Sequence, residues 1–153
     1  MLVLLFDLGG DRYALDARQV VEVLPLVRIK QIPQPPRGVA GVLNYRGAPV
    51  PVIDLTALML GRPSRTSLST RLIMAHYPAG EGPARVVGLI AEHATETMRR
   101  PDQDFVEAGL NVNGAPYLGR IATDPGGMVQ LVDVSRLLPS AVRDQLFQQV
   151  IEG

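Results

Sequence analysis

Two aspartates that each follow an apolar segment are the residues of this chain best placed to do chemistry. Asp54 follows Val-Pro-Val-Ile at 50–53, and Asp133 follows Val-Gln-Leu-Val at 129–132. Two carboxylates at equivalent places can share a proton and serve as acid and base, as in aspartic proteases. Neither aspartate is followed by Thr-Gly or Ser-Gly, however, and each precedes a helix-like run. Helix capping, in which the carboxylate accepts from unpaired amides, is therefore the favoured interpretation.

The other polar residues form no recognisable reaction centre. His76 and His93 are the only histidines, and neither belongs to a pattern that binds a metal. The chain has no cysteine, no Walker lysine, no Gly-x-Gly-x-x-Gly and no Gly-x-Ser-x-Gly. We therefore expect a protein that is not an enzyme and needs no metal or cofactor. A small enzyme with an unrecognised carboxylate site is the alternative that stays open.

Composition limits the classes of partner. The 15 basic and 15 acidic residues balance, so no net positive charge attracts nucleic-acid phosphates. The three Phe and four Tyr do not cluster with arginine as they do in barrels that bind single strands. The apolar start at 1–6 is too short for a membrane span and lacks the basic region of a signal peptide. We expect a cytoplasmic protein that binds no nucleic acid and does not insert into a membrane.

Hydrophobic periodicity predicts a chain of mainly short strands. We expect strands at 2–8, 12–15, 26–32, 39–43, 49–53, 71–76, 85–91, 117–122 and 128–132, and a hairpin loop at 77–84. Short helices are expected at 17–24, where Asp16 is the cap, at 55–60 and at 134–138. A C-terminal helix begins at Ser140 with an apolar face formed by Val142, Leu146, Phe147, Val150 and Ile151.

A tight turn at 44–47 is the most informative local feature. Asn44 and Gly47 tolerate positive φ, so Asn-Tyr-Arg-Gly predicts a turn between two apolar strands. Arg46 then lies at the tip of the turn, where its charge stays in water. Asp54 follows the second strand as a helix cap, and Gly61 ends the helix.

The sequence also repeats itself weakly. Asp133 lies 79 positions after Asp54, and Val-Gly-Leu at 87–89 lies 74 positions after Tyr-Ala-Leu at 13–15. Two nearly equal offsets predict two similar lobes, each a small strand-rich barrel closed by a short capped helix.

These residues resemble the signature of CheW-like chemotaxis coupling domains. The pattern Gly-Val-x-Asn-x-Arg-Gly stands at 41–47, and Pro-Val-Ile-Asp-Leu stands at 51–55. The resemblance covers essentially the whole chain and weakens after about position 93. It implies a mainly β fold of two small five-stranded SH3-like barrels packed side by side, with short capping helices and a C-terminal helix. Residues 1–153 would form a single CheW-like domain made of two pseudo-repeated barrel lobes.

The resemblance also implies a function. The chain would be a non-catalytic adaptor that couples the cytoplasmic tips of methyl-accepting chemoreceptors to the regulatory domain of a CheA-type histidine kinase in a chemosensory array. The run at 22–27 resembles coupling proteins of non-flagellar systems. A stand-alone β-barrel module that binds an unrelated protein is the alternative.

Five positions match the receptor-contact sites of the family, which line an apolar groove between the lobes. They are Val20 and Glu22 on the expected first helix, Gly41 before the turn, Arg46 at its tip, and Gly88 in the second lobe. Arg46 is the best functional candidate, because a turn-tip arginine can pair with a carboxylate of a partner. The chain departs from the family at 92–97, where members carry a more apolar segment.

Overall fold

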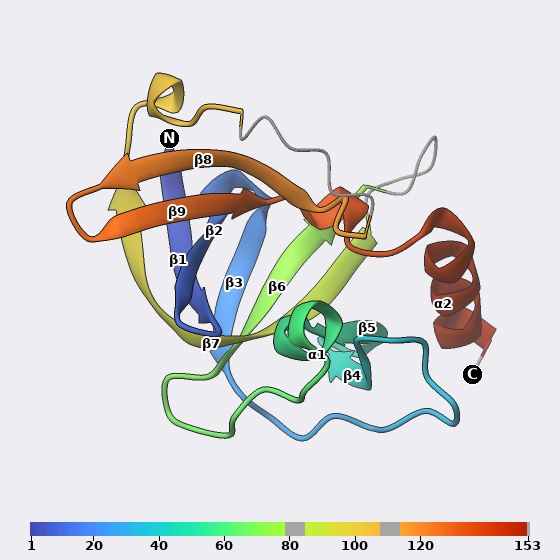
Figure 1. Ribbon diagram of the computed structural model, residues 1–153. Helices are drawn as coiled ribbons and strands as arrows, with labels where there is room; N and C mark the ends of the chain where they lie inside the picture. Colours follow the sequence, from blue (N-terminus) through green and yellow to red (C-terminus); the bar gives the residue numbers. More distant parts are fainter. Residues whose placement is uncertain (79–84, 108–113, 153) are drawn as a thin grey trace.

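Two groups of five strands that share one long strand, β7, build the computed structural model (Figure 1). The structure describes residues 1–78, 85–107 and 114–152. The strands are β1 (Leu2–Leu8), β2 (Asp11–Asp16), β3 (Val20–Pro25), β4 (Val39–Tyr45), β5 (Ala48–Asp54), β6 (Arg71–Tyr77), β7 (Arg85–Arg99), β8 (Leu118–Asp124) and β9 (Gly127–Val132). The helices are α1 (Leu55–Leu60) and α2 (Ser140–Glu152), with single 3-10 turns η1 (Ala17–Gln19), η2 (Asp102–Asp104) and η3 (Val134–Arg136).

Each group of strands forms one barrel-like lobe. Lobe 1 contains β1, β2, β8, β9 and the 92–99 part of β7, in the order β7-β1-β2-β9-β8. Lobe 2 contains β3, β4, β5, β6 and the 85–91 part of β7, in the order β3-β6-β7-β5-β4. Each barrel is closed by one isolated bridge between its two end strands. In lobe 2, Lys30, in the segment after β3, pairs with Val42 of β4, and in lobe 1, Val106, in the segment after β7, pairs with Ile121 of β8. This arrangement agrees with the predicted mainly β fold of two five-stranded barrels.

The lobes are not the two halves of the chain. Lobe 1 takes β1 and β2 from the first half and β8 and β9 from the second, and lobe 2, otherwise built from the first half, takes the start of β7 from the second half. The two offsets found in the sequence nevertheless relate equivalent pairs. In lobe 2, Val52 pairs with Gly88, and in lobe 1, Leu131 pairs with Ala14. Leu131 lies 79 positions after Val52, and Gly88 lies 74 positions after Ala14, so the two parallel pairs are equivalent.

Alternating side chains of the buried strands supply three separate cores. In β1, Val3 and Leu5 face the interior of lobe 1, whereas Leu4 and Phe6 face a large core that both lobes share. The interior of lobe 2 is a third cluster, which includes Leu72 of β6. A strand that is buried on both faces reads as a continuous apolar run, which is why β1 looks so hydrophobic in the sequence.

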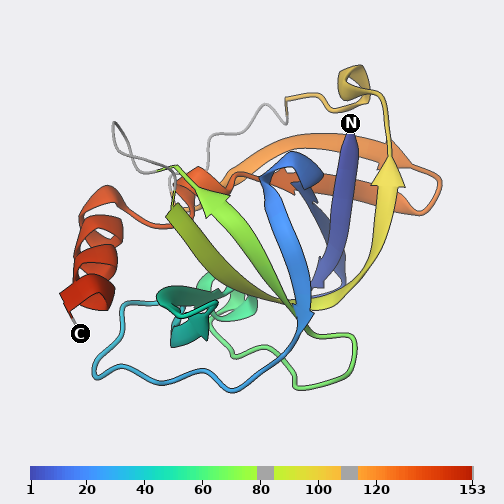
Figure 2. The same cartoon turned by 180° about the vertical axis from the view of Figure 1, so that it is seen from behind.

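The C-terminal helix α2 crosses from the end of lobe 1 to pack beside β5 of lobe 2, as both views show (Figures 1 and 2). Phe147 is buried, with its ring edge-on to Tyr77 at 5.6 Å between centroids, and the Arg85 guanidinium lies 5.0 Å from the centre of the Phe147 ring. Leu146 is also buried. The predicted apolar face is thus confirmed at these two positions, while the side chains at 149–152 lie outside the described residues.

Two predicted elements are wrong. The helix expected at 17–24 is one 3-10 turn at 17–19, capped by the Asp16 carboxylate, and the chain then continues as strand β3. The β-branched residues Val20, Val21 and Val23 fit a strand, and pairing with β6 overrides the helical spacing. The strand expected at 26–32 is reduced to the single bridge at Lys30.

Strand β7 is longer than predicted, because it continues from lobe 2 into lobe 1. Its bend falls at Glu92 and His93, where His93 has φ 52° and the register against β1 shifts between Leu5 and Asp7. A left-handed residue that is not glycine is uncommon, and here it lets one strand serve two differently oriented sheets. Most of the hairpin loop predicted at 77–84 lies outside the described residues.

Candidate partner-binding site

The turn at the end of the β4–β5 hairpin presents the exposed arginine. Arg46 and Gly47 both have positive φ, 51° and 84°, between the paired residues Tyr45 and Ala48. Positive φ at both central residues is the geometry of a type I′ hairpin turn. The tight turn expected here is present, and of the two residues expected to tolerate positive φ, Gly47 adopts it and Asn44 does not. Asn44 instead holds the turn, because its Oδ1 accepts the Gly47 N–H at 3.1 Å.

Arg46 is paired within the chain although its side chain is 71% exposed. Its guanidinium donates to Oε2 of Glu22, and the Tyr45 hydroxyl donates to the same oxygen at 2.5 Å. The guanidinium also lies 5.0 Å from the centre of the Tyr45 ring. The hydrogen bond to Glu22, together with burial, raises the pKa of Tyr45. The structure thus brings together two predicted site residues, Glu22 and Arg46, and adds Tyr45, which the sequence interpretation missed.

Three of the five predicted residues lie on one row across the strands of lobe 2. Glu22 pairs with Met74, Met74 pairs with Gly88, Gly88 pairs with Val52, and Val52 pairs with Gly41. Paired residues project to the same face of a sheet, so this row points toward the interior of lobe 2. Glu22 reaches solvent at the end of the row, and its side chain is 30% exposed.

The two glycines of this row are buried and pack closely. A Cβ at Gly88 would lie 3.1 Å from Leu72 and 3.2 Å from Val52. A Cβ at Gly41, where φ is 149°, would lie 2.0 Å from the Lys30 carbonyl oxygen, which no side chain can do. Close packing of the backbone therefore accounts for both glycines, and neither presents a side chain to a partner.

Val20 lies on strand β3, not on a helix. It is half-buried and packs against the core that the two lobes share. Strand β3 pairs on one side with β6 and stands at the end of the strand order, so its outer residues are accessible. Val23 and, just after the strand, Val27 are 38% and 43% exposed. The β3 side of lobe 2 therefore presents apolar surface next to the Glu22–Arg46 pair.

The two aspartates are helix caps, as predicted. Asp54, 7% exposed, accepts the Thr56 and Ala57 N–H groups at 3.1 and 3.3 Å, and also the N–H and hydroxyl of Ser64 at 2.9 and 2.6 Å. Asp133 accepts the N–H and hydroxyl of Ser135 at 3.0 and 2.6 Å. Carboxylates that are filled by donors of their own chain serve structure rather than proton transfer.

A second buried carboxylate, Glu92, supports the loop after α1. It accepts from the Thr56 hydroxyl at 3.2 Å, from Arg62 at 3.4 Å and from the Arg65 N–H at 3.4 Å. The two histidines are exposed, and within the described ranges no group of three or more metal-ligating side chains comes together. Also within these ranges, no helix combines the length and the apolar character needed to cross a membrane.

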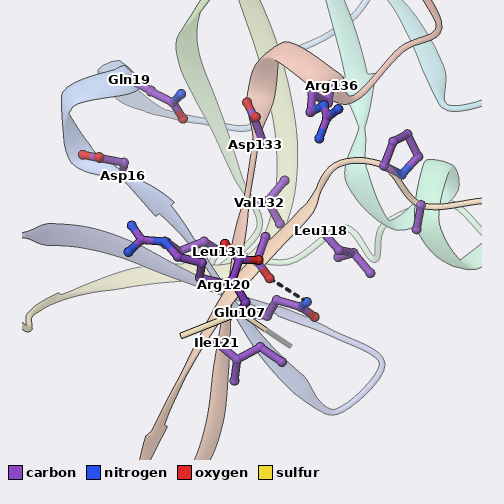
Figure 3. Close-up of a pocket in the computed structure, with 14 residues that line it drawn as sticks. Asp16, Gln19, Glu107, Leu118, Arg120, Ile121, Leu131, Val132, Asp133 and Arg136 are labelled. Carbon is purple, nitrogen blue, oxygen red and sulfur yellow. Dashed lines mark hydrogen bonds between the residues drawn. The ribbon is translucent and has the colours of Figure 1, made fainter. Parts of the chain in front are cut away.

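A mixed polar hollow of about 570 Å³ lies on lobe 1, away from the five predicted residues. Figure 3 shows Asp16 and Gln19 on one side of it, Asp133 and Arg136 on another, and Arg120 below them in this view. Arg120 is held by the Asp102 carboxylate at 3.1 Å, and this hydrogen bond lowers the pKa of Asp102. The hydrogen bond from Arg18 likewise lowers the pKa of Asp16. Two charged residues of the hollow, Asp16 and Arg120, are thus neutralised by ion pairs with Arg18 and Asp102.

Comparison with known proteins gives a consistent picture. A family model described as CheW-like domain matches residues 2–142. The chemotaxis protein CheW of Klebsiella aerogenes is 27% identical over 143 residues, which cover 90% of this chain and 81% of that protein. Protein FrzA of Myxococcus xanthus is 27% identical over 139 residues, covering 89% and 84%. The crystal structure of the scaffolding protein TtCheW from Thermoanaerobacter tengcongensis superposes with a TM-score of 0.78 and 25% identity, covering 90% of this chain and 87% of that one.

Proposed function

This chain belongs to the CheW-like domain family and is a coupling adaptor of chemotaxis signalling, and we propose that it joins the cytoplasmic tips of chemoreceptors to the regulatory domain of a CheA-type histidine kinase. The observation that carries the proposal is the family match over residues 2–142, together with the Arg46 turn exposed at the end of its hairpin. The likeness to TtCheW, a scaffolding protein, supports it.

We propose further that the protein has no catalytic activity of its own. The two carboxylates that could serve as acid and base are occupied by hydrogen bonds from Thr56, Ala57, Ser64 and Ser135. An adaptor acts by binding. It changes the activity of a kinase only to the extent that it binds the active and the inactive arrangements of its partners with different affinity. Such partners lie on the cytoplasmic side of the membrane, and we place this chain there with them.

The receptor contact is assigned to the β3 side of lobe 2. Glu22, Tyr45 and Arg46 form a polar cluster there, beside the exposed Val23 and the half-buried Val20. An arginine held in place by a carboxylate and an aromatic ring is pre-organised, so it loses little side-chain freedom on binding. The buried Gly41 and Gly88 contribute by shaping the sheet that carries this cluster.

The two lobes offer a physical route between the two partners. Strand β7 is continuous from lobe 2 to lobe 1, and the two lobes share one hydrophobic core. A rigid body of this kind carries a small movement at one surface to the other through packed contacts. We therefore place the receptor and the kinase on different parts of the molecule.

Titration calorimetry with the purified receptor tip and kinase regulatory domain of the same organism tests this proposal. Arg46→Ala should weaken the receptor complex at least about tenfold, in the range of an interface arginine. Arg99→Ala, which removes an exposed arginine of lobe 1, is the matched control and should leave the receptor complex unchanged. Binding of the wild-type protein to neither partner would refute the coupling function and favour a barrel with an unrelated partner.

A further inference from the structure

The neutral chain is divided into a basic lobe and an acidic lobe. Residues 17–91, which supply almost all of lobe 2, contain nine Arg or Lys and three Asp or Glu, a net charge of +6. The remaining residues contain six basic and twelve acidic residues, a net charge of −6. A charge distribution of this size creates opposite potentials on the two lobes and selects partners by the sign of their charge.

The basic charge is concentrated in the segment from β3 to β5. Between Glu22 and Asp54 there is no acidic residue, whereas Arg28, Lys30, Arg37 and Arg46 all lie there. Arg46 is paired with Glu22, and Arg37 donates to the Leu58 carbonyl at 3.2 Å. Arg28 and Lys30 are exposed, and no carboxylate of the described residues forms an ion pair with either. Two cations of this segment are thus available to a partner.

Arg28 and Lys30 line a groove between the 26–31 segment and β4. Lys30 exchanges both backbone hydrogen bonds with Val42, at 2.9 and 2.8 Å, and this is the only bridge of the 26–31 segment to β4 in the described structure. Beyond the bridge a hollow of about 570 Å³ opens, lined by Arg28, Ile29, Lys30, Gln31, Val42 and Asn44.

The polar side chains of the groove are cations and amides, with no carboxylate among them. Asn44 already uses Oδ1 to accept the Gly47 N–H, which leaves its NH₂ group as a donor. The half-buried Ile29 and Val42 supply an apolar lining, and Val27 is exposed nearby in the sequence. The groove therefore combines hydrogen-bond donors and positive charge with a small apolar surface.

We propose that this groove on lobe 2 docks an acidic, extended segment of a partner protein, with Arg28 and Lys30 contacting its carboxylates. Carboxylates complement the two cations and the amide N–H donors of the lining, and an extended chain fits the gap between the 26–31 segment and β4. This inference deepens the proposed adaptor function by naming the chemistry of a segment that the adaptor recognises. It is separate from the Glu22–Tyr45–Arg46 cluster assigned to the receptor.

Other polyanions fit this surface less well. The groove lining has no aromatic side chain on which a nucleic-acid base could stack. The net charge of −6 on the rest of the chain repels a long polyanion or an anionic membrane, whereas a short acidic segment touches lobe 2 alone.

Fluorescence anisotropy with a synthetic probe tests the proposal without kinase or receptor. The probe is a fluorescein-labelled decapeptide of alternating glutamate and threonine, and its counterpart with every glutamate replaced by glutamine is the neutral control. The double variant R28Q/K30Q should bind the acidic peptide about tenfold more weakly than wild type, as expected for two partly exposed ion pairs. The matched variant R99Q/R136Q removes two exposed lobe 1 arginines, changes the net charge equally, and should bind within about twofold of wild type.

Salt adds an independent measurement. Raising NaCl from about 50 mM to about 300 mM shortens the screening length and should weaken wild-type binding much more than binding by R28Q/K30Q. Equal losses in the two double variants, equal binding of the neutral peptide, or displacement of the peptide by a single-stranded oligonucleotide at lower concentration would each overturn the proposal. No wild-type binding would overturn it too, while leaving the calorimetric result for receptor and kinase untouched.

Discussion

Replacing Gly41 by alanine should destabilise the whole of lobe 2. Gly41 has φ 149°, and a Cβ built there lies 2.0 Å from the Lys30 carbonyl oxygen and 2.8 Å from its carbon. These are backbone atoms, so no rotation of a side chain relieves the collision. The 26–31 segment must move away from β4, and the closing bridge between Lys30 and Val42 then breaks.

The cost follows from the contacts that are lost. The bridge holds two backbone hydrogen bonds, at 2.9 and 2.8 Å, each of which contributes about 0.5–1.5 kcal/mol net. Forcing an extra carbon into a packed site costs about 1–3 kcal/mol more. We therefore expect Gly41→Ala to lower the free energy of unfolding by about 2–6 kcal/mol. This figure does not include the backbone strain that any L-residue meets at this φ. The loss is a large share of the about 5–15 kcal/mol by which a typical domain is stable.

Gly127→Ala is the matched control for that strain. Gly127 has φ 128°, but a Cβ there meets no atom within 4 Å. Both variants are unfolded in urea and followed by far-ultraviolet circular dichroism, and the difference between their unfolding free energies isolates the collision. Values for the two variants that agree within about 0.5 kcal/mol would refute the reasoning, because the strain alone would then explain both.

Two further outcomes follow from the capping residues and from a buried phenol. Asp54→Ala should cost about 3 kcal/mol and Asp133→Ala about 1 kcal/mol in urea unfolding, because Asp54 accepts four hydrogen bonds and Asp133 two; equal costs would contradict this ranking. Burial raises the pKa of Tyr77, so its contribution to stability is complete below the unfolded pKa of about 10 and declines as the pH rises above it. Tyr77→Phe should therefore lose less stability between about pH 8 and about pH 11 than wild type, and an unchanged alkaline slope would argue against a titrating Tyr77.

Helix caps and the β4–β5 hairpin could be predicted from the sequence, because they depend on residues that are close together in the chain. An aspartate before a helical run is a cap whatever surrounds it, and Asp54, Asp133 and Asp16 are all caps in the structure. The β4–β5 hairpin was predictable for the same reason, although Arg46 rather than Asn44 takes the positive φ. Such features need only hydrogen bonds that span a few positions.

Features that depend on distant residues could not be predicted in the same way. The 17–24 segment has helical spacing, but β6, some fifty residues later, pairs with Val20 and its neighbours and makes a strand. Arg46 was expected free in water, and its partner Glu22 lies 24 residues earlier. A signal for Tyr45 did exist, because it stands beside Arg46 in the turn pattern, but only the fold brings it to Glu22.

The buried glycines illustrate the same limit. The resemblance assigned receptor contact to Gly41 and Gly88, and whether a partner touches their surroundings stays a prediction. The structure adds that a Cβ at Gly41 would collide with the Lys30 backbone, whereas a Cβ at Gly88 would press on the Leu72 and Val52 side chains at 3.1 and 3.2 Å. In the sequence, a glycine that is needed because a distant segment packs against it cannot be distinguished from a glycine that a partner contacts.

The exchange of strands between the lobes bears on how the chain is synthesised. Lobe 2 has all its strands once residue 91 has left the ribosome, whereas lobe 1 waits for β8 and β9, so β1 and β2 emerge more than a hundred residues before their last partner. During that time their edges and apolar faces are open to aggregation. A cut of the finished chain between α1 and β6, in contrast, leaves both barrels incomplete, and only the two fragments together can restore either.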